Sequence, residues 1–284
     1  MSVGSGGDGP NARYTDRARA AMSAANSIAV AVGGSEILPE HVLAGILSLG
    51  ESVAAASLVR ANVDLFGLLA RLPRAGSPAL ATTDRRLPIG QLTREIIECA
   101  WIESARLADD YVGTQHLLLA IVRHARNRAA PVLADFGVTL DGIRAAVQSV
   151  ISEGKVCERV AAQIRNREYA AAAASCREAI VLNRQSVYGH RQLAWLLSAC
   201  ADAAVRDGPR AVEHAKHACE LTGDKDAECL YALAAAHAEV REFTEAVRLM
   251  RRAMELTRED RHALGRLMLS RFEAGESWRD PELS

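Results

Sequence analysis

The stretch YVGTQHLLLAIV at residues 111–122 is matched 75 positions earlier by ILPEHVLAGIL at residues 37–47. Each phrase has a short polar step, then an acid or its amide, a histidine and an apolar run. The same shift places residues 14–72 on residues 89–147 without a gap. A gapless register over about sixty residues indicates a tandem duplication.

Both copies are predicted to be helical. In the second copy, residues 91–107 place a mostly apolar stripe at helical spacing. A second helix opens at Thr114, and a third covers 128–136. The fourth is predicted to begin near Leu140 and to run to about Ile151. Each copy is therefore expected to contain four helices.

Three residues mark the expected helix ends. Thr114 is predicted to be an N-cap, because its hydroxyl suits the free N–H groups of a first turn. Pro39 holds the matching place in the first copy and suits a first helical turn. Gly137 is predicted to end the third helix in a left-handed conformation.

A different repeat fills the second half of the chain. AVEHAKHACELT at 211–222 is followed 35 positions later by AVRLMRRAMELT at 246–257. An earlier relative, AAAASCREAIVL, occupies 171–182. The spacing is close to the roughly 34 residues of a tetratricopeptide repeat. The three segments share a small residue at one position: Ala179, Ala218 and Ala253.

The composition supports an all-helical, globular chain. It is 49% hydrophobic, 24% charged and only 4% aromatic, which favours helices over sheet. The net charge of −1 gives no field to attract nucleic acid or an anionic membrane. No apolar run approaches the roughly 20 residues of a membrane span. Residues 1–12 are expected to be a flexible tail rather than a signal peptide, which predicts a cytoplasmic location.

Histidine and cysteine patterns predict structural roles and no metal. No cysteine pair has a metal-ligand spacing, so reduced, packed thiols are expected. His41 and His116 precede the two apolar runs and are predicted to be packed or hydrogen-bonded. His214 and His217, three residues apart, could share a metal, but no third ligand is evident, so a solvated face is expected.

Catalytic motifs are not found in the sequence. Ser57, Ser104 and Ser175 lack the G-x-S-x-G context of a hydrolase nucleophile. Gly154-Lys155 is followed by valine and lies outside any phosphate-binding G-x-x-x-x-G-K-[ST] motif. We therefore expect neither an enzyme nor a cofactor, and no ATP-driven unfolding.

The duplicated half resembles the amino-terminal double repeat of Clp ATPases. The resemblance rests on YTDRARAAMSAA and ILPEHVLAGIL in the first copy. In the second copy it rests on LTREIIECAWIESARLADDYVGTQHLLLAIV and FGVTLDGIRAAV. It implies one domain over 13–152, made of pseudo-symmetric four-helix units at 13–75 and 88–152. It also implies docking of substrates and adaptors without catalysis.

The same resemblance implies a candidate phosphoarginine site. In such domains a threonine that opens the first helix holds the phosphate, and the acid before the histidine holds the guanidinium. Both chemistries are sound, because helix N-termini attract phosphate and carboxylates pair with guanidinium groups. Thr15 and Glu40 match in the first copy, whereas Gly90 and Gln115 stand in the second. The alternative is that Glu40 is a solvated first-turn acid favoured by the helix dipole.

Residues 156–275 resemble bacterial tetratricopeptide (TPR) proteins, on the repeats above and on LYALAAAHAE at 230–239. The resemblance implies antiparallel helix pairs stacked into a short superhelix with a groove that binds peptides. A capping helix is expected from Leu264 to Phe272, followed by a loose tail, ESWRDPELS, at 276–284. The candidate groove residues are Tyr188, Arg191, Gln192 and Lys225.

The predicted fold is thus all-α, with a pseudo-twofold duplicated four-helix Clp-N domain followed by a TPR-like α-α superhelix. The predicted function is a non-enzymatic adaptor whose partners are proteins or peptides, including Clp protease machinery or its substrates. The alternative is a scaffold in signalling or envelope assembly with a repurposed Clp-N domain. An enzyme whose site is assembled from scattered residues is the third class of hypothesis.

Overall fold

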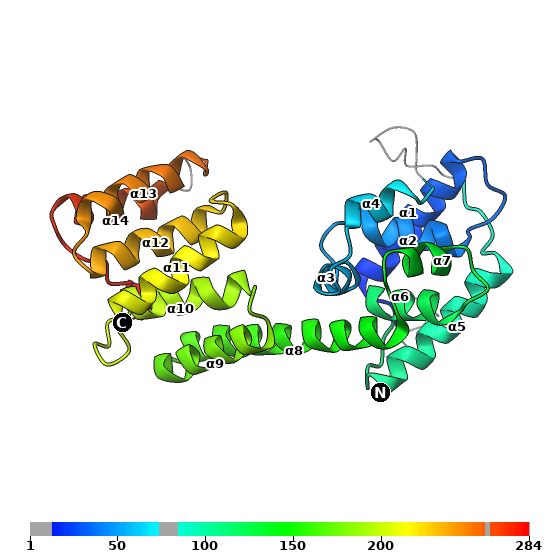
Figure 1. The fold of residues 1–284 in the computed structure, drawn as a ribbon, viewed down its shortest axis with the longest axis horizontal. Coiled ribbons are helices and arrows are strands. Elements are labelled where there is room, and N and C mark those ends of the chain that lie inside the picture. The colour runs from blue at the N-terminus through cyan, green and yellow to red at the C-terminus, as the bar shows by residue number, and fades with distance from the viewer. Residues whose placement is uncertain (1–12, 74–84, 259–261, 284) are drawn as a thin grey trace, which may run out of the picture. The chain divides into compact units, whose positions relative to one another are not determined.

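The computed structural model describes residues 13–73, 85–258 and 262–283 (Figure 1). The predicted tail at 1–12 lies outside this part of the chain. Every regular element in the described ranges is a helix, and β-type backbone pairing occurs there only as isolated bridges. The all-α prediction is confirmed.

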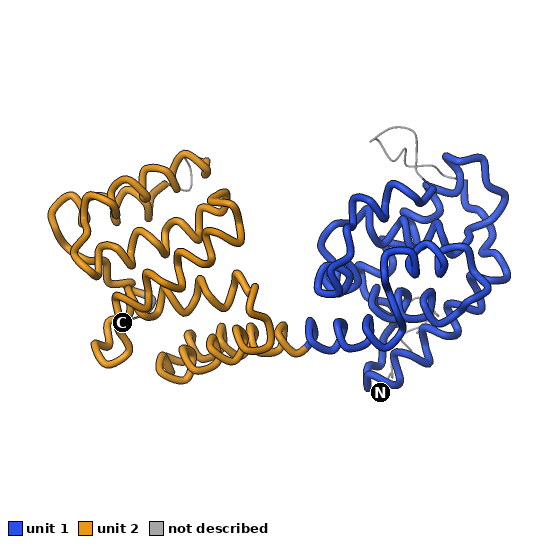
Figure 2. Tube along the Cα trace, viewed as in Figure 1, with its two compact units in different colours: residues 1–151 blue, residues 152–284 orange. Residues whose placement is uncertain are grey.

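The chain divides into two compact units, residues 1–151 and 152–284 (Figure 2). The helices that begin in unit 1 are α1 (Asp16–Ala31), α2 (Pro39–Ser48), α3 (Val53–Arg60), α4 (Leu65–Ala70), α5 (Gln91–Arg106), α6 (Thr114–Arg123), α7 (Ala129–Asp135) and α8 (Leu140–Arg165). Those of unit 2 are α9 (Tyr169–Leu182), α10 (Val187–Ala199), α11 (Gly208–Thr222), α12 (Ala227–Glu239), α13 (Phe243–Glu255), α14 (His262–Glu273) and the 3-10 turn η2 (Pro281–Leu283).

Unit 1 is a pseudo-twofold pair of repeats, α1–α4 and α5–α8. Short backbone bridges join the two repeats at Tyr14 with Val112 and at Ile37 with Ile89. A shift of 75 residues converts the first bridge into the second, with the partners exchanged. The predicted duplication is therefore visible in the pairing of the backbone itself.

Within the first repeat, α1 and α2 pack with their backbones unusually close. A Cβ on Gly45 would lie 2.4 Å from the carbonyl oxygen of Ala21 and 2.9 Å from the amide nitrogen of Ala25. Only glycine leaves room for this approach. The second repeat has Ala120 at the matching position, fully buried between its own helices.

Unit 2 is an array of helical hairpins. Helix α10 packs against α9, α11 and α12, and α13 packs against α12 and α14. The small residues predicted to share one position are all fully buried: Ala179, Ala218 and Ala253. Small side chains at these positions let successive helices pack closely.

Two predicted helix ends are wrong. Thr114 is the first residue of α6, and Gly113 is its N-cap. The fourth helix does not stop at Ile151, because α8 continues to Arg165. The extension has an apolar stripe of its own: Val156 and Val160 are buried in the core of unit 2.

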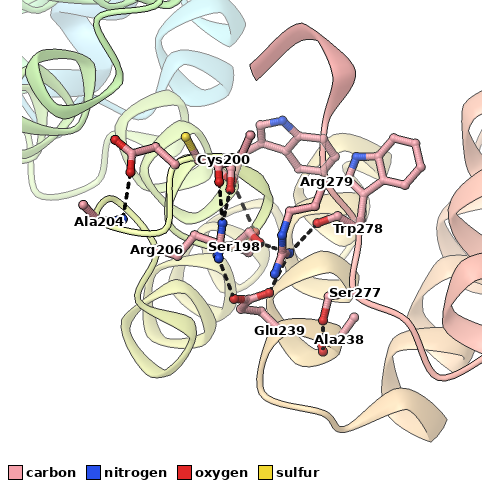
Figure 3. A network of polar contacts seen from close by, with 12 residues as sticks. Ser198, Cys200, Ala204, Arg206, Ala238, Glu239, Ser277, Trp278 and Arg279 are labelled. Atoms are coloured by element: carbon pink, nitrogen blue, oxygen red, sulfur yellow. Dashed lines mark hydrogen bonds and ion pairs between the residues drawn. The ribbon is translucent and has the colours of Figure 1, made fainter. Parts of the chain in front are cut away.

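The predicted loose tail at 276–283 is also wrong, since this segment is packed onto unit 2. Trp278 is 4% exposed and Leu283 is 2% exposed. Arg279 lies 2.7 Å from the Glu239 carboxylate, which Arg206 approaches from its other side at 3.2 Å (Figure 3). Two apolar anchors and a shared carboxylate hold a segment whose polar composition suggested solvent exposure.

No single helix in the described ranges is long and apolar enough to cross a membrane. Helices α2 and α3 reach that composition only together, as a pair bent by 89°.

Candidate functional site

Thr15 lies where the first repeat meets the second. It is the N-cap of α1, and its hydroxyl accepts a hydrogen bond from the Ala18 amide at 3.1 Å. Its own amide donates to the carbonyl of Val112, also at 3.1 Å. The start of α1 therefore lies beside the segment that opens α6, in the other repeat.

Gly90 has the pseudo-symmetric position. It is the N-cap of α5, and its amide donates to the carbonyl of Ile37 at 3.0 Å. A Cβ on Gly90 would lie 3.0 Å from a carboxylate oxygen of Glu36. The positive end of α5 thus already has an anionic side chain from the first repeat against it.

No hydrogen bond or ion pair in the described residues joins Thr15 to Glu40, and the backbone pairs Thr15 with Val112 of the second repeat. Phosphoarginine binding by these two residues therefore stays a prediction. Gly45 of α2 packs between Ala21 and Ala25 of α1, and the two helices run antiparallel through a short connection. At a rise of 1.5 Å per residue, Thr15 and Glu40 lie roughly 20 Å apart along this hairpin.

The pairs that do form are crossed between repeats. The Thr15 helix start lies beside the phrase that holds Gln115, and the Gly90 helix start lies beside the phrase that holds Glu40. One crossed pair thus has the Thr15 hydroxyl and the Gln115 amide, and the other has Gly90 and the Glu40 carboxylate. Neither pair combines a threonine with an acid, the two residues on which the predicted phosphoarginine site depends.

Glu40 and Gln115 are both buried, at 9% and 5% exposed. The alternative prediction of a solvated Glu40 is therefore wrong. The Gln115 side chain folds back over Gly113, the N-cap of α6. A Cβ on Gly113 would lie 2.3 Å from Oε1 of the Gln115 side chain. The first repeat has Leu38 in place of that glycine, so Glu40 cannot fold back in this way.

The two repeated histidines are structural, as predicted. Nδ1 of His41 accepts a hydrogen bond from the Leu38 amide at 3.0 Å, and Nδ1 of His116 accepts one from the Gly113 amide at 2.9 Å. Each imidazole thus satisfies an N-cap amide, in the way that a glutamate or glutamine does in a capping box. An accepting Nδ1 needs the neutral ring.

Burial lowers the pKa of both histidines, which favours this neutral form. For His116 the loss of solvent outweighs the nearby Asp109 carboxylate, which lies 3.1 Å from Nε2 and acts to raise the pKa. For His41 burial likewise outweighs the raising effect of Glu40 on the pKa.

A buried charge cluster in the second repeat was not predicted. Glu103 is 1% exposed, and one of its oxygens lies 2.9–3.1 Å from three guanidinium groups. These belong to Arg106, Arg123 and Arg144. Burial acts to raise the pKa of Glu103, but the hydrogen bonds from the arginines outweigh it, so the pKa lies below its ordinary value.

In unit 2, two of the four predicted groove residues line a cavity of about 260 Å³: Arg191 and Gln192. The ring of Tyr188 lies 5.9 Å from the Arg191 guanidinium, and its hydroxyl donates to the carbonyl of Cys157. Lys225 is exposed in the α11–α12 connection and does not line the cavity.

The cavity has further lining residues that the sequence did not single out as groove residues: Trp195, Glu228, Tyr231, Ala232, Leu264 and Asp280. The one available signal was helical periodicity, since residues 188, 191, 192 and 195 share one face of α10.

His214 and His217 gain a third histidine in the fold. Nδ1 of His190 lies 3.0 Å from Nδ1 of His214, and the His190 ring centroid lies 4.5 Å from that of His217. Nε2 of His190 lies 3.2 Å from the carbonyl of Arg184. Within the described residues, no group of three or more histidine, cysteine or acidic side chains is arranged to hold a metal.

The cysteines and serines have local, structural surroundings. Burial raises the pKa of Cys176 and of Cys219 to about 12, so both thiols stay protonated and poorly nucleophilic at neutral pH. Ser57 donates to the carbonyl of Val53, and Ser104 to that of Tyr111. The Ser175 hydroxyl accepts from Arg159.

The family model of the Clp repeat (R) N-terminal domain matches residues 13–129 and 90–173, which together cover more than half of the chain. The chain belongs to this family. The match includes both repeats of unit 1, with the crossed bridges and both capping histidines, and it extends through α8 into unit 2.

Several curated proteins are similar to parts of this Clp-repeat chain. An uncharacterized protein of Mycobacterium tuberculosis is 36% identical over 110 residues, which is 39% of this chain and 43% of that protein. The negative regulator of genetic competence ClpC/MecB of Bacillus subtilis is 29% identical over 150 residues, 50% of this chain and 18% of that protein. The chaperone protein ClpB of Oceanobacillus iheyensis is 27% identical over 143 residues, with the same coverage. The chain thus matches less than half the length of each of these relatives.

Solved structures of Clp-type N-terminal domains are also similar to it. The Hsp104 N-terminal domain from Candida albicans aligns with a TM-score of 0.37 and 20% identity, over 47% of this chain and 88% of that domain. The N-terminal domain of ClpD from Arabidopsis thaliana aligns with a TM-score of 0.38 and 17% identity, over 51% of this chain and 99% of that domain.

Proposed function

We propose that this chain is a non-enzymatic adaptor that binds two different kinds of protein. Unit 1 docks Clp substrates or Clp-associated proteins, and unit 2 acts as a TPR-like module that recruits a second protein. The observation that carries the proposal is a Clp repeat, a protein-interaction module in Clp ATPases, on the same chain as a separate array of helical hairpins. Two linked modules gain avidity from their high effective concentration.

Each unit offers a feature suited to contact with protein. In unit 1, Phe66 on α4 is 82% exposed, the highest value for a large apolar side chain in the described residues. In unit 2, the cavity around Arg191 lies among α10, α12 and α14, on successive hairpins. Burial of exposed apolar and arginine side chains commonly anchors protein interfaces.

Affinity capture of the full-length chain under native conditions, followed by mass spectrometry, tests the adaptor function. We expect two sets of partners, one lost with Phe66→Asp and the other lost with Arg191→Ala. Only the unaltered chain should recover both sets together. The adaptor proposal fails if no protein is recovered, or if both variants lose the same proteins.

Partner identity decides between the adaptor and its alternative. Clp ATPases, Clp protease subunits or their substrates in the unit 1 set support the adaptor in a cytoplasmic setting. Kinases or secretion components in that set favour a scaffold in signalling or envelope assembly.

A further inference from the structure

The charge cluster around Glu103 contains more positive than negative charge. The guanidinium groups of Arg106, Arg123 and Arg144 all lie 2.9–3.1 Å from one oxygen of Glu103. A further acid, Asp141, lies 3.7 Å from Arg144, but its side chain is fully exposed, so solvent screens its charge. Three positive charges therefore face one buried and one solvated negative charge.

These arginines are accessible from solvent. Their side chains are 28–49% exposed, whereas Glu103 is 1% exposed. A guanidinium has five N–H donors, and Arg106 and Arg123 each use one of them on Glu103. Further donors therefore remain on side chains that a ligand can reach, while Glu103 holds the three groups in place from beneath.

Two more arginines lie on the connection between α6 and α7. Arg126 and Arg128 are exposed, and neither forms an ion pair within the described ranges. Between them Asn127 is 2% exposed. Its side chain donates to the carbonyl of Ile121 at 2.8 Å and accepts from the amide of Ala130 at 2.8 Å. The two arginines thus lie on a connection that is tied to both helices.

The first repeat has no basic residue at any of these places. A shift of 75 residues converts the five arginines to Ala31, Ser48, Glu51, Val53 and Leu69. The duplicated fold therefore forms without them. A single arginine can pair with a carboxylate through two parallel hydrogen bonds, so neutralisation of Glu103 leaves a surplus of positive charge on this surface.

The arrangement of these cations suits several separate anions. Three guanidinium groups that converge on one oxygen of Glu103 turn their unused edges apart, so they cannot close together on one phosphoryl group. Arg126 and Arg128 lie further along the chain, on either side of a buried residue. The net charge of −1 gives no long-range field for a polyanion such as nucleic acid. A run of acidic side chains on a partner supplies separate carboxylates that complement the local charge.

We propose that this basic surface docks an acidic segment of a partner protein through ion pairs with successive aspartate or glutamate side chains. The basic surface consists of Arg106, Arg123, Arg126, Arg128 and Arg144. The proposal rests on the adaptor function and names the chemistry of a partner that unit 1 recognises.

Fluorescence anisotropy of the full-length chain with short labelled peptides tests the proposal. One peptide alternates glutamate with serine, and the matched peptide has glutamine in place of every glutamate. We expect the glutamate peptide to bind at low salt and to weaken as salt is added, because exposed ion pairs are screened. The glutamine peptide should not bind. Equal binding of the two peptides, or binding of neither, overturns the proposal.

Three further probes distinguish other anionic ligands. They are a single-stranded oligonucleotide, vesicles that contain an anionic lipid, and inorganic phosphate as a competitor at constant ionic strength. The glutamate peptide should bind more tightly than the oligonucleotide or the vesicles, and phosphate should not displace it. The reverse order, or displacement by phosphate, overturns the proposal.

Variants then assign the binding to the basic surface. The double variant Arg126→Gln, Arg128→Gln should weaken the glutamate peptide by about three- to tenfold, and Arg106→Gln by about two- to fivefold. Asp141→Asn should strengthen it, because this acid competes for Arg144. Thermal melting checks that each variant keeps its fold. Unchanged binding by the double variant, or weaker binding by Asp141→Asn, overturns the proposal.

The matched control is the double variant Arg251→Gln, Arg252→Gln. It removes two exposed arginines from α13 in unit 2 and changes the net charge by the same amount. It should bind the glutamate peptide as the unaltered chain does. Equal weakening by both double variants would show that net charge alone drives binding, and would overturn the proposal.

The peptide test is separate from the capture experiment. If two sets of proteins are captured but the peptides do not discriminate, this inference fails and the adaptor survives. If the glutamate peptide binds at the basic surface but no protein is captured, the adaptor fails.

Discussion

The two repeats of unit 1 fill one core position with opposite chemistry. The second repeat has Glu103, 1% exposed, and the first repeat has Ile28, 4% exposed, at the matching place. The difference extends to the three ion-pair partners of Glu103. Its arginine partners at 106, 123 and 144 correspond to Ala31, Ser48 and Leu69.

This comparison shows that a duplicated core can exchange an apolar contact for a charged one only as a set. A buried carboxylate without its cations carries a large desolvation cost. The partly exposed arginines without the carboxylate lose their shared partner at a smaller cost. The register of the helices was kept, while four positions on three helices changed chemistry together.

The largest expected effect comes from breaking this set. Glu103→Ala leaves three guanidinium groups around a site without an anion, and we expect a loss of about 3 kcal/mol in the free energy of unfolding. This is the lower end of the usual range, because the arginine side chains are 28–49% exposed. Urea denaturation measures it.

The matched control gives the second repeat the four residues that the first repeat has at the matching positions. The fourfold variant Glu103→Ile, Arg106→Ala, Arg123→Ser, Arg144→Leu should be within about 1 kcal/mol of the unaltered chain, because the carboxylate and its cations leave together. A graft as damaging as Glu103→Ala alone would show that the two repeats differ in more than this set.

The next effect concerns the spacing of the first two helices of each repeat. Gly45→Ala drives a Cβ into the backbone of α1, and we expect a loss of about 2 kcal/mol in unfolding free energy. The reciprocal Ala120→Gly in the second repeat should cost about 1 kcal/mol, from helix propensity and a small void. Thermal melting of both variants tests the order, and equal losses would contradict it.

A smaller effect is the pH dependence that the capping histidines give. Burial holds the pKa of His116 below its ordinary 6.5, so the unfolded chain takes up a proton more readily than the folded chain. The stability from this cap is present above pH 6.5 and is lost as the pH falls below it. His116→Gln retains a cap acceptor and should lose less stability between about pH 7.5 and 5.5.

Asp109→Asn tests the same pH dependence and should make it steeper, whereas His116→Gln should make it shallower. The Asp109 carboxylate acts to raise the pKa of His116, so its removal should lower that pKa further and steepen the loss of stability on acidification. Denaturation at both pH values measures the slopes. Parallel slopes for all three proteins would show that His116 does not titrate in this range.

The smallest expected effect is a gain of phosphoarginine binding. Gln115→Glu places an acid in the phrase that lies beside the Thr15 helix start, which completes the crossed pair. Titration with phosphoarginine should show binding a few-fold stronger than that of the unaltered chain. Thr15→Ala in the same background should remove the gain, and a gain that persists would place the ligand elsewhere.

Much of the fold was predictable because the spacing of apolar residues along the chain determines where the helices form. The apolar run from Leu117 to Val122 repeats that from Val42 to Leu47, so the helices and their duplicated register follow from spacing. The structural role of His41 and His116 followed from the same phrases, because a histidine without chemical partners at suitable spacing serves the helix that it opens.

The candidate site was less predictable because it depends on backbone pairing between distant segments. No local pattern indicates that the Thr15 amide donates to Val112, and this contact is what separates Thr15 from Glu40. In unit 2, Arg191 and Gln192 followed from one helix face. Asp280 could not, since its place depends on the burial of Trp278, two residues earlier in a polar segment.

Helix α8 has a consequence for how such chains are assembled and cut. Ile143 and Val147 belong to the core of unit 1, while Val156 and Val160 belong to that of unit 2. A fragment cut at residue 151 would expose the carbonyls of an interrupted helix, so expressed fragments should overlap over all of α8. One residue inserted at this point would rotate the downstream apolar stripe by about 100° against the upstream stripe, whereas seven would nearly restore its phase.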